Sequence, residues 1–323
     1  MDLPPYIDRP GGYDGALRGP YLQEDVSLRG YVIAAGHSAL VAMCDRYLNA
    51  PAHGKVEYRP FASFVTLVFA DMRKVSAGDA TLGSMREIDV GVFVPVLRYE
   101  PGHLLPSGIA VFMPYLFVSN DWALITGREG GLGFRKNIGL SFTDGDDDVD
   151  APGGAERLTH VDAWTIKQRG ADARLGRQRL IEVSGDHRAP PSLETHAHPL
   201  DFLRSVLGKM AGEVAADVLK AIMQRRLATN AEAGVHIPIV FLKQMRDAHR
   251  GGQAIVQEVF EANGFMPLSS FRSGHLLGGQ QQVRIANPAS HPIAAEIGVT
   301  PDVPLEVKFA FEVDCDFSVA MQT

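Results

Sequence analysis

The chain has 323 residues, of which 46% are hydrophobic and 21% charged, as in globular proteins with a sizeable buried core. Its net charge of −7 argues against binding to nucleic acid or to anionic membranes, since both require a basic face. The sequence shows no secretory signal, and no apolar run reaches the roughly 20 residues of a membrane span. We therefore expect a cytoplasmic protein with no nucleic-acid or membrane partner, whose two cysteines are reduced.

Apolar spacing predicts a first helix over residues 38–49, with Ser38 as its N-cap. Short β-branched and aromatic runs then predict strands at ASFVTLVFADM, DVGVFVPVLRY, GIAVFMPYLFVS and DWALITG. Later strands are predicted at VHIPIVFLKQM, AIVQEVFEAN, QQVRIANP and LEVKFAFEVDCDFSVAM. Because the sequence has no internal repeat and no linker, it favours one α+β domain over residues 1–323. We expect a mostly antiparallel sheet or barrel with helices packed outside it.

One long helix is predicted between residues 198 and about 230, where apolar residues recur every four positions. The repeating positions are Phe202, Val206, Met210, Val214, Val218 and Ile222. They form one stripe of an amphipathic helix of roughly seven turns, longer than the average globular helix. We expect this stripe to cover the sheet or a partner subunit.

A basic pair, Arg135 and Lys136, follows a glycine-rich turn in an apolar neighbourhood. A lysine becomes a nucleophile when burial or a nearby cation lowers its pKa from about 10.4 and frees the amine. Arg135 and Arg128 could supply that cation, and the free amine could condense with a ketone to form an imine. The alternative is that the pair belongs to a solvated turn.

Two carboxylates stand two residues apart in MREIDVGVFVPV. On a strand, Ile88, Val90, Val92 and Val94 would form one face, and Glu87, Asp89, Gly91 and Phe93 the other. Glu87 and Asp89 would then share a face and could act as a general acid and base, or they could be solvent-facing charges. A metal site is not favoured, because the pair His196 and His198 has no carboxylate partner at a fixed spacing.

The run FVSNDWALITGREGGLGFRKNIG (residues 117–139) resembles the central motif of the acetoacetate decarboxylase family. Asn120, Gly127, Arg128 and Glu129 match that motif, and Gly133 with Phe134 resembles the residues before the family's lysine pair. RGPY near the N-terminus, FVPV and PIVFLKQM resemble further family segments. The resemblance implies a cone-shaped, mostly antiparallel β-barrel wrapped by helices, in which residues 198–232 would be an inserted helix. It also implies a homo-oligomer that decarboxylates a 3-oxo acid through a lysine imine, without metal or organic cofactor; acetoacetate decarboxylase is a standard example of such an activated lysine.

The sequence departs from the family motif at the basic pair, where Arg-Lys-Asn replaces Pro-Lys-Lys. Alignment on Gly133 and Phe134 places the nucleophile at Lys136, whereas counting from Glu129 places Arg135 there, and an arginine cannot form an imine. We prefer Lys136, because this alignment also matches the two residues that follow the pair. Asp89 falls where the family has a catalytic-site glutamate. These departures make acetoacetate an improbable substrate and favour comparison with relatives that act on 2-oxo acids.

The sequence thus predicts a cofactor-independent lyase that forms a Schiff base with a small or medium oxo acid or ketone. The resemblance makes Lys136 the nucleophile and Asp89, with Glu87, the proton carrier. The predicted substrate-binding residues are Arg128, Arg135, Asn137, Tyr115, Trp122 and Phe134. Two alternatives remain: a hydratase, isomerase or hydrolase that does not use the lysine, and a non-catalytic ligand-binding protein of the same fold.

Overall fold

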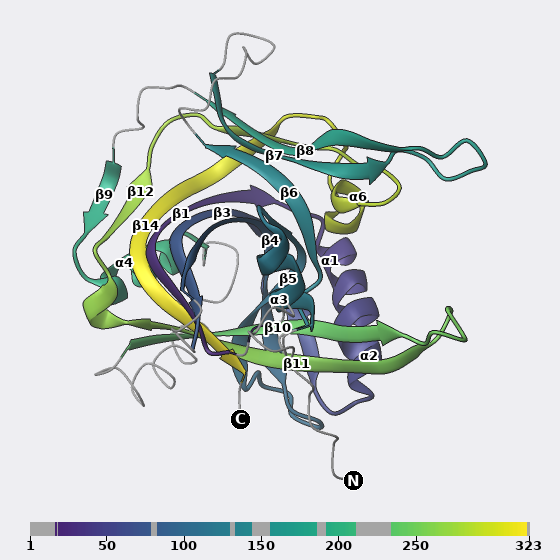
Figure 1. The fold of residues 1–323 in the computed structure, drawn as a ribbon. Helices are drawn as coiled ribbons and strands as arrows, with labels where there is room; N and C mark the ends of the chain where they lie inside the picture. Colours follow the sequence, from purple (N-terminus) through teal and green to yellow (C-terminus); the bar gives the residue numbers. More distant parts are fainter. Residues whose placement is uncertain are drawn as a thin grey trace.

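The structure is a computed structural model, and it describes residues 17, 19–78, 83–129, 133–143, 156–185, 192–210 and 234–321. Strands dominate this part of the chain (Figure 1). The strands are β1 (Tyr21–Ala34), β2 (Glu57–Pro60), β3 (Phe64–Ala77), β4 (Met85–Tyr99), β5 (Gly108–Val118), β6 (Lys136–Thr143), β7 (Glu156–Ile166), β8 (Leu175–Gly185), β9 (Ser192–His196), β10 (Gly234–Arg246), β11 (Ala254–Pro267), β12 (Ser273–Leu277), β13 (Gln282–Ile285) and β14 (Leu305–Met321).

The helices of the described residues are short. They are α1 (His37–Cys44), which continues through a π-helical turn (Asp45–Asn49) into α2 (Ala50–Ala52), then α3 (Asp121–Glu129), α4 (Pro199–Met210), a 3₁₀ turn (Leu268–Ser270) and α6 (Ile293–Ile297). The first predicted helix is confirmed. Its N-cap is Gly36 rather than the predicted Ser38, so no side chain caps this helix. Only the start of the predicted long helix falls within α4, and residues 211–233 lie outside the described residues. None of the described helices has the length and apolar character needed to cross a membrane.

Within the described residues the strands form one mixed, 14-stranded sheet. Most neighbours are antiparallel, whereas β5 pairs in parallel with both β10 and β6. The pairings β14–β1–β3–β4–β5–β10–β11 return to β14, so these strands are linked in a ring. In Figure 1 β14, β1 and β3 curve side by side, β10 and β11 cross below them, and β6, β7 and β8 lie above. The predicted sheet-rich α+β fold is confirmed.

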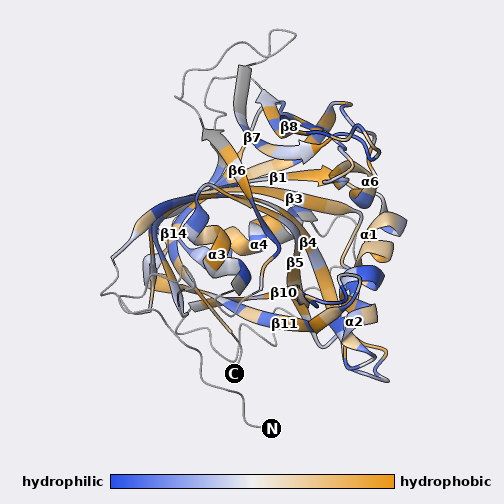
Figure 2. Ribbon diagram, turned by 45° about the vertical axis from the view of Figure 1, so that its right-hand side comes forward, coloured by the Kyte–Doolittle hydropathy of each residue, from blue (hydrophilic) through white to orange (hydrophobic). Residues whose placement is uncertain are grey.

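The two faces of the curved sheet carry different side chains. On β4, Val90, Val92 and Val94 are fully buried in the largest hydrophobic cluster, which also contains residues of α1 and α6 on the outer face. The alternate residue Phe93 packs instead in the cluster that contains Ala123 of α3. The predicted division of β4 into two faces is therefore confirmed. Figure 2 shows the apolar character of β1 and β3 that this double-sided burial requires.

The inner face is organised in rows of residues that are paired across β4, β3, β1 and β14. Successive rows are Glu87–Met72–Val26–Cys315, Asp89–Ala70–Leu28–Val313, Gly91–Val68–Gly30–Phe311 and Phe93–Thr66–Val32–Phe309. Helix α4 packs on this face, since Phe202 and Val206 share a cluster with Val313 and Cys315. Glu87 and Asp89 of β4 thus belong to the first two rows of the inner face.

Candidate active site

Lys136 is held between α3 and β5. It is the first residue of β6, where it pairs with Leu116 of β5. Before it, the Phe134 N–H donates to the Gly127 carbonyl oxygen of α3 at 2.8 Å, and the Phe134 ring centre lies 4.5 Å from that of Phe241 of β10, with the ring planes tilted by 49°. These contacts fix the chain on both sides of the turn and direct the lysine side chain to the inner face.

The strand predicted at DWALITG is wrong, because this segment forms helix α3. The side chain of Asn120 decides this, because its Oδ1 accepts the Ala123 N–H at 2.8 Å and so caps the helix N-terminus. Its Nδ2 donates to the Arg86 carbonyl oxygen at 3.2 Å, which ties the cap to β4. With helical spacing, Ala123 and Leu124 of this segment face the inner cluster. The cap and this packing outweigh the strand propensity of DWALITG.

Substitution of Asn120 with alanine should destabilise the protein by about 1 kcal/mol, within the range of 0.5–2 kcal/mol for lost N-caps. Urea unfolding measures this difference. Replacement with aspartate keeps the capping oxygen, so it should restore most of the stability. Equal stability of the alanine variant and the unmodified chain would contradict the role of Asn120 as a cap.

Three ionisable groups meet on the inner face. The Lys136 Nζ donates to Glu87 Oε1 at 2.9 Å and lies 3.9 Å from Asp89 Oδ2. Their side chains are 11%, 5% and 18% exposed, so this is a buried cluster rather than a solvated turn or a solvent-facing pair. The Asp89 Oδ1 is also buried and has no hydrogen-bond partner among the described residues. A buried carboxylate oxygen without a partner is costly, which favours protonation of Asp89.

The cluster shifts the pKa values of two of its members. Burial and the neighbouring charge of Glu87 raise the pKa of Asp89 well above its usual value, against the opposing effect of Lys136. Burial by itself lowers the pKa of Lys136, but the charges of Asp89 and Glu87 and the bond to Glu87 outweigh it and raise that pKa. The two raised pKa values favour the ammonium form of Lys136 and the protonated form of Asp89.

The prediction that an arginine lowers the pKa of Lys136 is wrong. Arg128 is exposed at the end of α3. Arg135 is exposed too, and its guanidinium lies 5.3 Å from the centre of the Tyr47 ring. The charges that act on the ammonium of Lys136 are those of Asp89 and Glu87 instead, and they raise its pKa.

The other predicted substrate-binding residues divide between the two faces. Phe134 is buried in the inner cluster, and Trp122 is half-buried in the first turn of α3. Asn137 pairs with Phe117 and alternates with Lys136 along β6, which directs it to the outer face. Tyr115 also belongs to the outer cluster. The structure therefore brings Phe134 close to the lysine segment but does not bring Tyr115, Arg135 and Asn137 to the face that holds Lys136.

The outer face carries a second polar cluster, which the sequence did not predict. Glu296 of α6 accepts hydrogen bonds from the hydroxyls of Tyr47 and Tyr115, both at 2.6 Å. Burial and the bond to Glu296 raise the pKa of Tyr115, so its hydroxyl stays protonated and fixed. No local signal links these three residues, because they come together only through the packing of distant elements. They hold the outer face of β5 at Tyr115, which precedes Leu116, the residue that pairs with Lys136.

Solved structures of known proteins share this arrangement of strands and helices. Acetoacetate decarboxylase from Legionella pneumophila superposes with a TM-score of 0.54 at 11% identity, over 98% of this chain and 92% of that chain. The chain adopts the fold of the acetoacetate decarboxylase superfamily. The enduracididine biosynthesis enzyme MppR, in complex with the condensation product of pyruvate and imidazole 4-carboxaldehyde, gives 0.52 at 10% identity over 100% and 96% of the two chains. MppR in complex with pyruvate gives 0.51 at 11% identity over 97% and 93%.

The resemblance read from the sequence is thus confirmed for the acetoacetate decarboxylase fold, of which this chain is a divergent example. No family model matches the sequence, and no curated protein does. The sequence predicts Asp89 as the main proton carrier, but in the structure Glu87 accepts the direct hydrogen bond from Lys136. Among the described residues, no group of three or more histidine, cysteine or acidic side chains is placed to bind a metal ion.

Proposed function

We propose that the chain is a cofactor-independent lyase that forms a Schiff base between Lys136 and the carbonyl carbon of an oxo acid or ketone. The observation that carries this proposal is the buried lysine with Glu87 at 2.9 Å and Asp89 at 3.9 Å. An amine, a base and an acid on one water-poor face are the groups that imine chemistry requires. Here the lysine is activated by proton transfer to a neighbour rather than by a lowered pKa.

The first step is transfer of a proton from the Lys136 ammonium to Glu87 along their hydrogen bond. The net charge of the cluster stays the same, because an ion pair becomes a neutral pair. Such a transfer is easier in a low-dielectric site than the release of a proton to water. A substrate that enters the site and displaces part of the ion pair would favour the neutral amine.

The free amine then attacks the carbonyl carbon. Its lone pair forms the new C–N bond, and the carbonyl oxygen takes a proton from Asp89 to become a hydroxyl. The nitrogen, now positively charged, passes one of its two protons to the Asp89 carboxylate. Loss of that hydroxyl as water, with a proton from Glu87, leaves a protonated imine. The raised pKa of Asp89 suits this task, because a carboxyl group that retains its proton can donate it to the carbonyl oxygen.

The protonated imine withdraws electrons from the adjacent carbon. Departure of carbon dioxide or of a proton from that carbon leaves an enamine, which accepts a proton or attacks a second carbonyl compound. Hydrolysis of the imine then frees the product and Lys136. Decarboxylation and aldol-type condensation share this path and differ only in the group that leaves. Among structures of similar fold, MppR has been captured with pyruvate and with a condensation product of pyruvate.

One observation favours a second candidate function. The pKa of Lys136 is raised, and an ammonium is a general acid rather than a nucleophile. On this alternative, Lys136 and Asp89 donate protons, Glu87 accepts them, and the protein is a hydratase or isomerase without a covalent intermediate.

Borohydride trapping separates the two candidates. The protein is incubated with a panel of 2-oxo acids, 3-oxo acids and simple ketones, reduced with sodium borohydride, and analysed by intact mass and peptide mapping. We expect a substrate-sized mass gain on the peptide that contains Lys136. A folded protein that turns over a panel compound but yields no adduct would support the non-covalent alternative.

Replacement of Asp89 with asparagine should stabilise the protein increasingly as the pH rises above about 4, where the carboxyl group of the unfolded chain ionises. Because the pKa of Asp89 is raised in the folded state, the native protein loses stability from that pH up to the folded pKa. An amide side chain does not ionise, so the variant would avoid this loss. Melting temperatures between pH 4 and pH 8 should therefore diverge in favour of D89N, while D172N, at an exposed turn, should follow the unmodified protein. A difference that is constant across this range would contradict the raised pKa.

A further inference from the structure

The row of inner-face residues that begins at Lys136 contains two glycines. Lys136 of β6 pairs with Leu116 of β5, and Leu116 pairs with Gly91 of β4. From Gly91 the row continues across β3 to Gly30 of β1 and Phe311 of β14. A glycine within a strand leaves space above the sheet for a neighbouring side chain or a ligand. At the far end of the row the Phe311 ring fills that space, because a Cβ atom at Gly30 would lie 2.2 Å from it.

The ring of Phe93 fills the space above the other glycine. A Cβ atom at Gly91 would lie 2.4 Å from this ring. Asp89, Gly91 and Phe93 are alternate residues of β4 and share one face, so the ring turns back along the strand towards Asp89. It therefore occupies the position that follows Asp89, whose carboxyl group lies 3.9 Å from the Lys136 ammonium.

The surroundings of Lys136 direct a bound substrate towards this ring. On the side of α3 there is no room, since a Cβ atom at Gly127 would lie 2.5 Å from the Lys136 side chain. Glu87 and Asp89 hold the ammonium over β4 instead. A carbon chain bonded to Nζ therefore extends along the inner face of β4 to Phe93. The Phe93 side chain is only half-buried, so part of it is accessible to a ligand.

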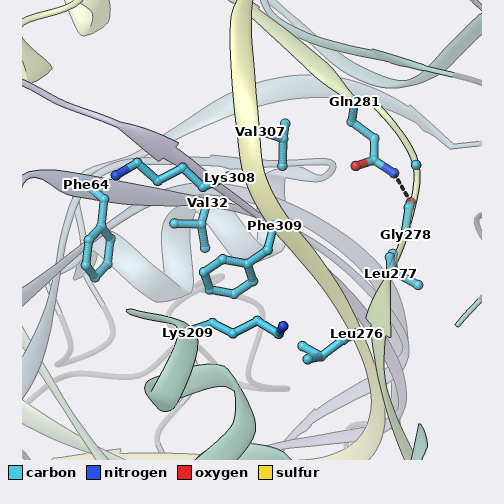
Figure 3. Close-up of a pocket in the computed structure, with 11 residues that line it drawn as sticks. Val32, Phe64, Lys209, Leu276, Leu277, Gly278, Gln281, Val307, Lys308 and Phe309 are labelled. Atoms are coloured by element: carbon cyan, nitrogen blue, oxygen red, sulfur yellow. Dashed lines mark hydrogen bonds between the residues drawn. The ribbon is translucent and has the colours of Figure 1, made fainter. Parts of the chain in front are cut away.

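Beyond Phe93 the inner face leads to a cavity of about 430 Å³ (Figure 3). Phe93 shares its row with Val32 and Phe309, and both of these residues line the cavity. In Figure 3 the Phe309 ring lies beside Val32 on its wall. This row is two residues from the row of Lys136, or about 7 Å at about 3.3 Å per residue. The Phe93 ring thus lies between Lys136 and apolar space that a longer ligand could use.

We propose that Phe93 sets the upper limit of substrate length, and that the substrate is a short oxo acid with a chain no longer than that of 2-oxobutanoate. This inference rests on the proposed Schiff base at Lys136, which fixes the position of the reacting carbon. The chain beyond that carbon lies against the Phe93 ring, and a longer chain overlaps the ring. A single methylene group that an apolar pocket does not fit changes the rate by about 10- to 200-fold.

Borohydride trapping with 2-oxo acids of increasing length tests this proposal. The unmodified protein should trap pyruvate and 2-oxobutanoate at least about 10-fold faster than 2-oxohexanoate and 2-oxooctanoate. F93A removes the ring and should trap 2-oxooctanoate at least about 10-fold faster than the unmodified protein does. F93L should shift the preference in the same direction by a smaller factor, and it replaces F93A if that variant does not fold.

Phe265 of β11 provides the matched control. It is half-buried like Phe93, and its ring also covers a glycine, because a Cβ atom at Gly234 of β10 would lie 2.4 Å from it. Gly234 is seven residues along β10 from Phe241, the residue beside Phe134. F265A should therefore keep the length preference of the unmodified protein.

Calorimetric titration with the same acids distinguishes failure of this proposal from failure of the proposed function, because it detects binding without an adduct. A preference for short acids that F93A reverses, with no adduct, would support the role of Phe93 and contradict the Schiff base. Adducts on Lys136 with the same length preference in F93A and the unmodified protein would overturn the role of Phe93 and leave the Schiff base intact. Equal trapping of short and long acids by the unmodified protein would do the same. If no acid binds or forms an adduct, both proposals are wrong.

Discussion

Replacement of Lys136 with alanine should abolish borohydride-dependent labelling and lower turnover by at least roughly 10³-fold, because the nucleophile of a covalent mechanism has no substitute. The lysine is buried, and on the proposed mechanism its amine forms the only covalent bond to substrate. Intact mass after reduction, together with a steady-state rate on the compound that traps best, measures both effects.

The arginine variant at the same position is the matched control. A guanidinium preserves the positive charge beside Glu87 and Asp89 but cannot form an imine. K136R should therefore keep more of the native stability than K136A, which leaves a buried Glu87 carboxylate without its partner. It should nevertheless show neither adduct nor turnover. Substantial turnover by either variant would favour the acid–base alternative.

Replacement of Gly127 with alanine should slow imine trapping by about 10²-fold, the cost of displacing a catalytic group by about 1 Å. A Cβ atom at this position would lie 2.5 Å from Lys136 Cδ and 2.6 Å from its Cε. The flexible lysine side chain would move to relieve the overlap, and its ammonium would leave the position that gives the 2.9 Å bond to Glu87. The trapping rate at saturating ketone measures the effect.

The stability of this variant should change little. Alanine is favoured over glycine in a helix by about 1 kcal/mol, and this offsets part of the roughly 1–3 kcal/mol cost of overpacking. Gly208 in α4 is the matched control, because a Cβ atom there meets nothing within 4 Å. G208A should be slightly more stable than the unmodified protein and should trap ketones at the normal rate. Normal trapping by G127A would mean that Lys136 does not need its present position.

Some features of the fold follow from local patterns. Alternation in MREIDVGVFVPV correctly divided β4 into two faces, because strand geometry alone directs successive side chains to opposite sides. That division placed Glu87 and Asp89 together before any contact was known. Apart from DWALITG, the predicted strands of the described residues and the first helix are confirmed by the structure. The resemblance of residues 117–139 to the acetoacetate decarboxylase family predicted a fold that the superposition confirms.

Other features depend on contacts between distant segments. DWALITG has strand-forming residues, but its Asn120 cap and its packing against the inner cluster make it a helix. The arginines expected to lower the lysine pKa lie next to Lys136 in sequence or across a glycine turn, yet their side chains point elsewhere. The residues that do set this pKa come from β4, and their charges outweigh the effect of burial.

The sequence by itself therefore indicated the class of fold, through strand periodicity and the resemblance of a local motif, and it predicted Lys136, Glu87 and Asp89 as candidate site residues. Only the tertiary structure decided how these residues act on one another. A pKa depends on burial and on charges within a few ångströms, and these are set by the pairing of β4 with β5 and of β5 with β6.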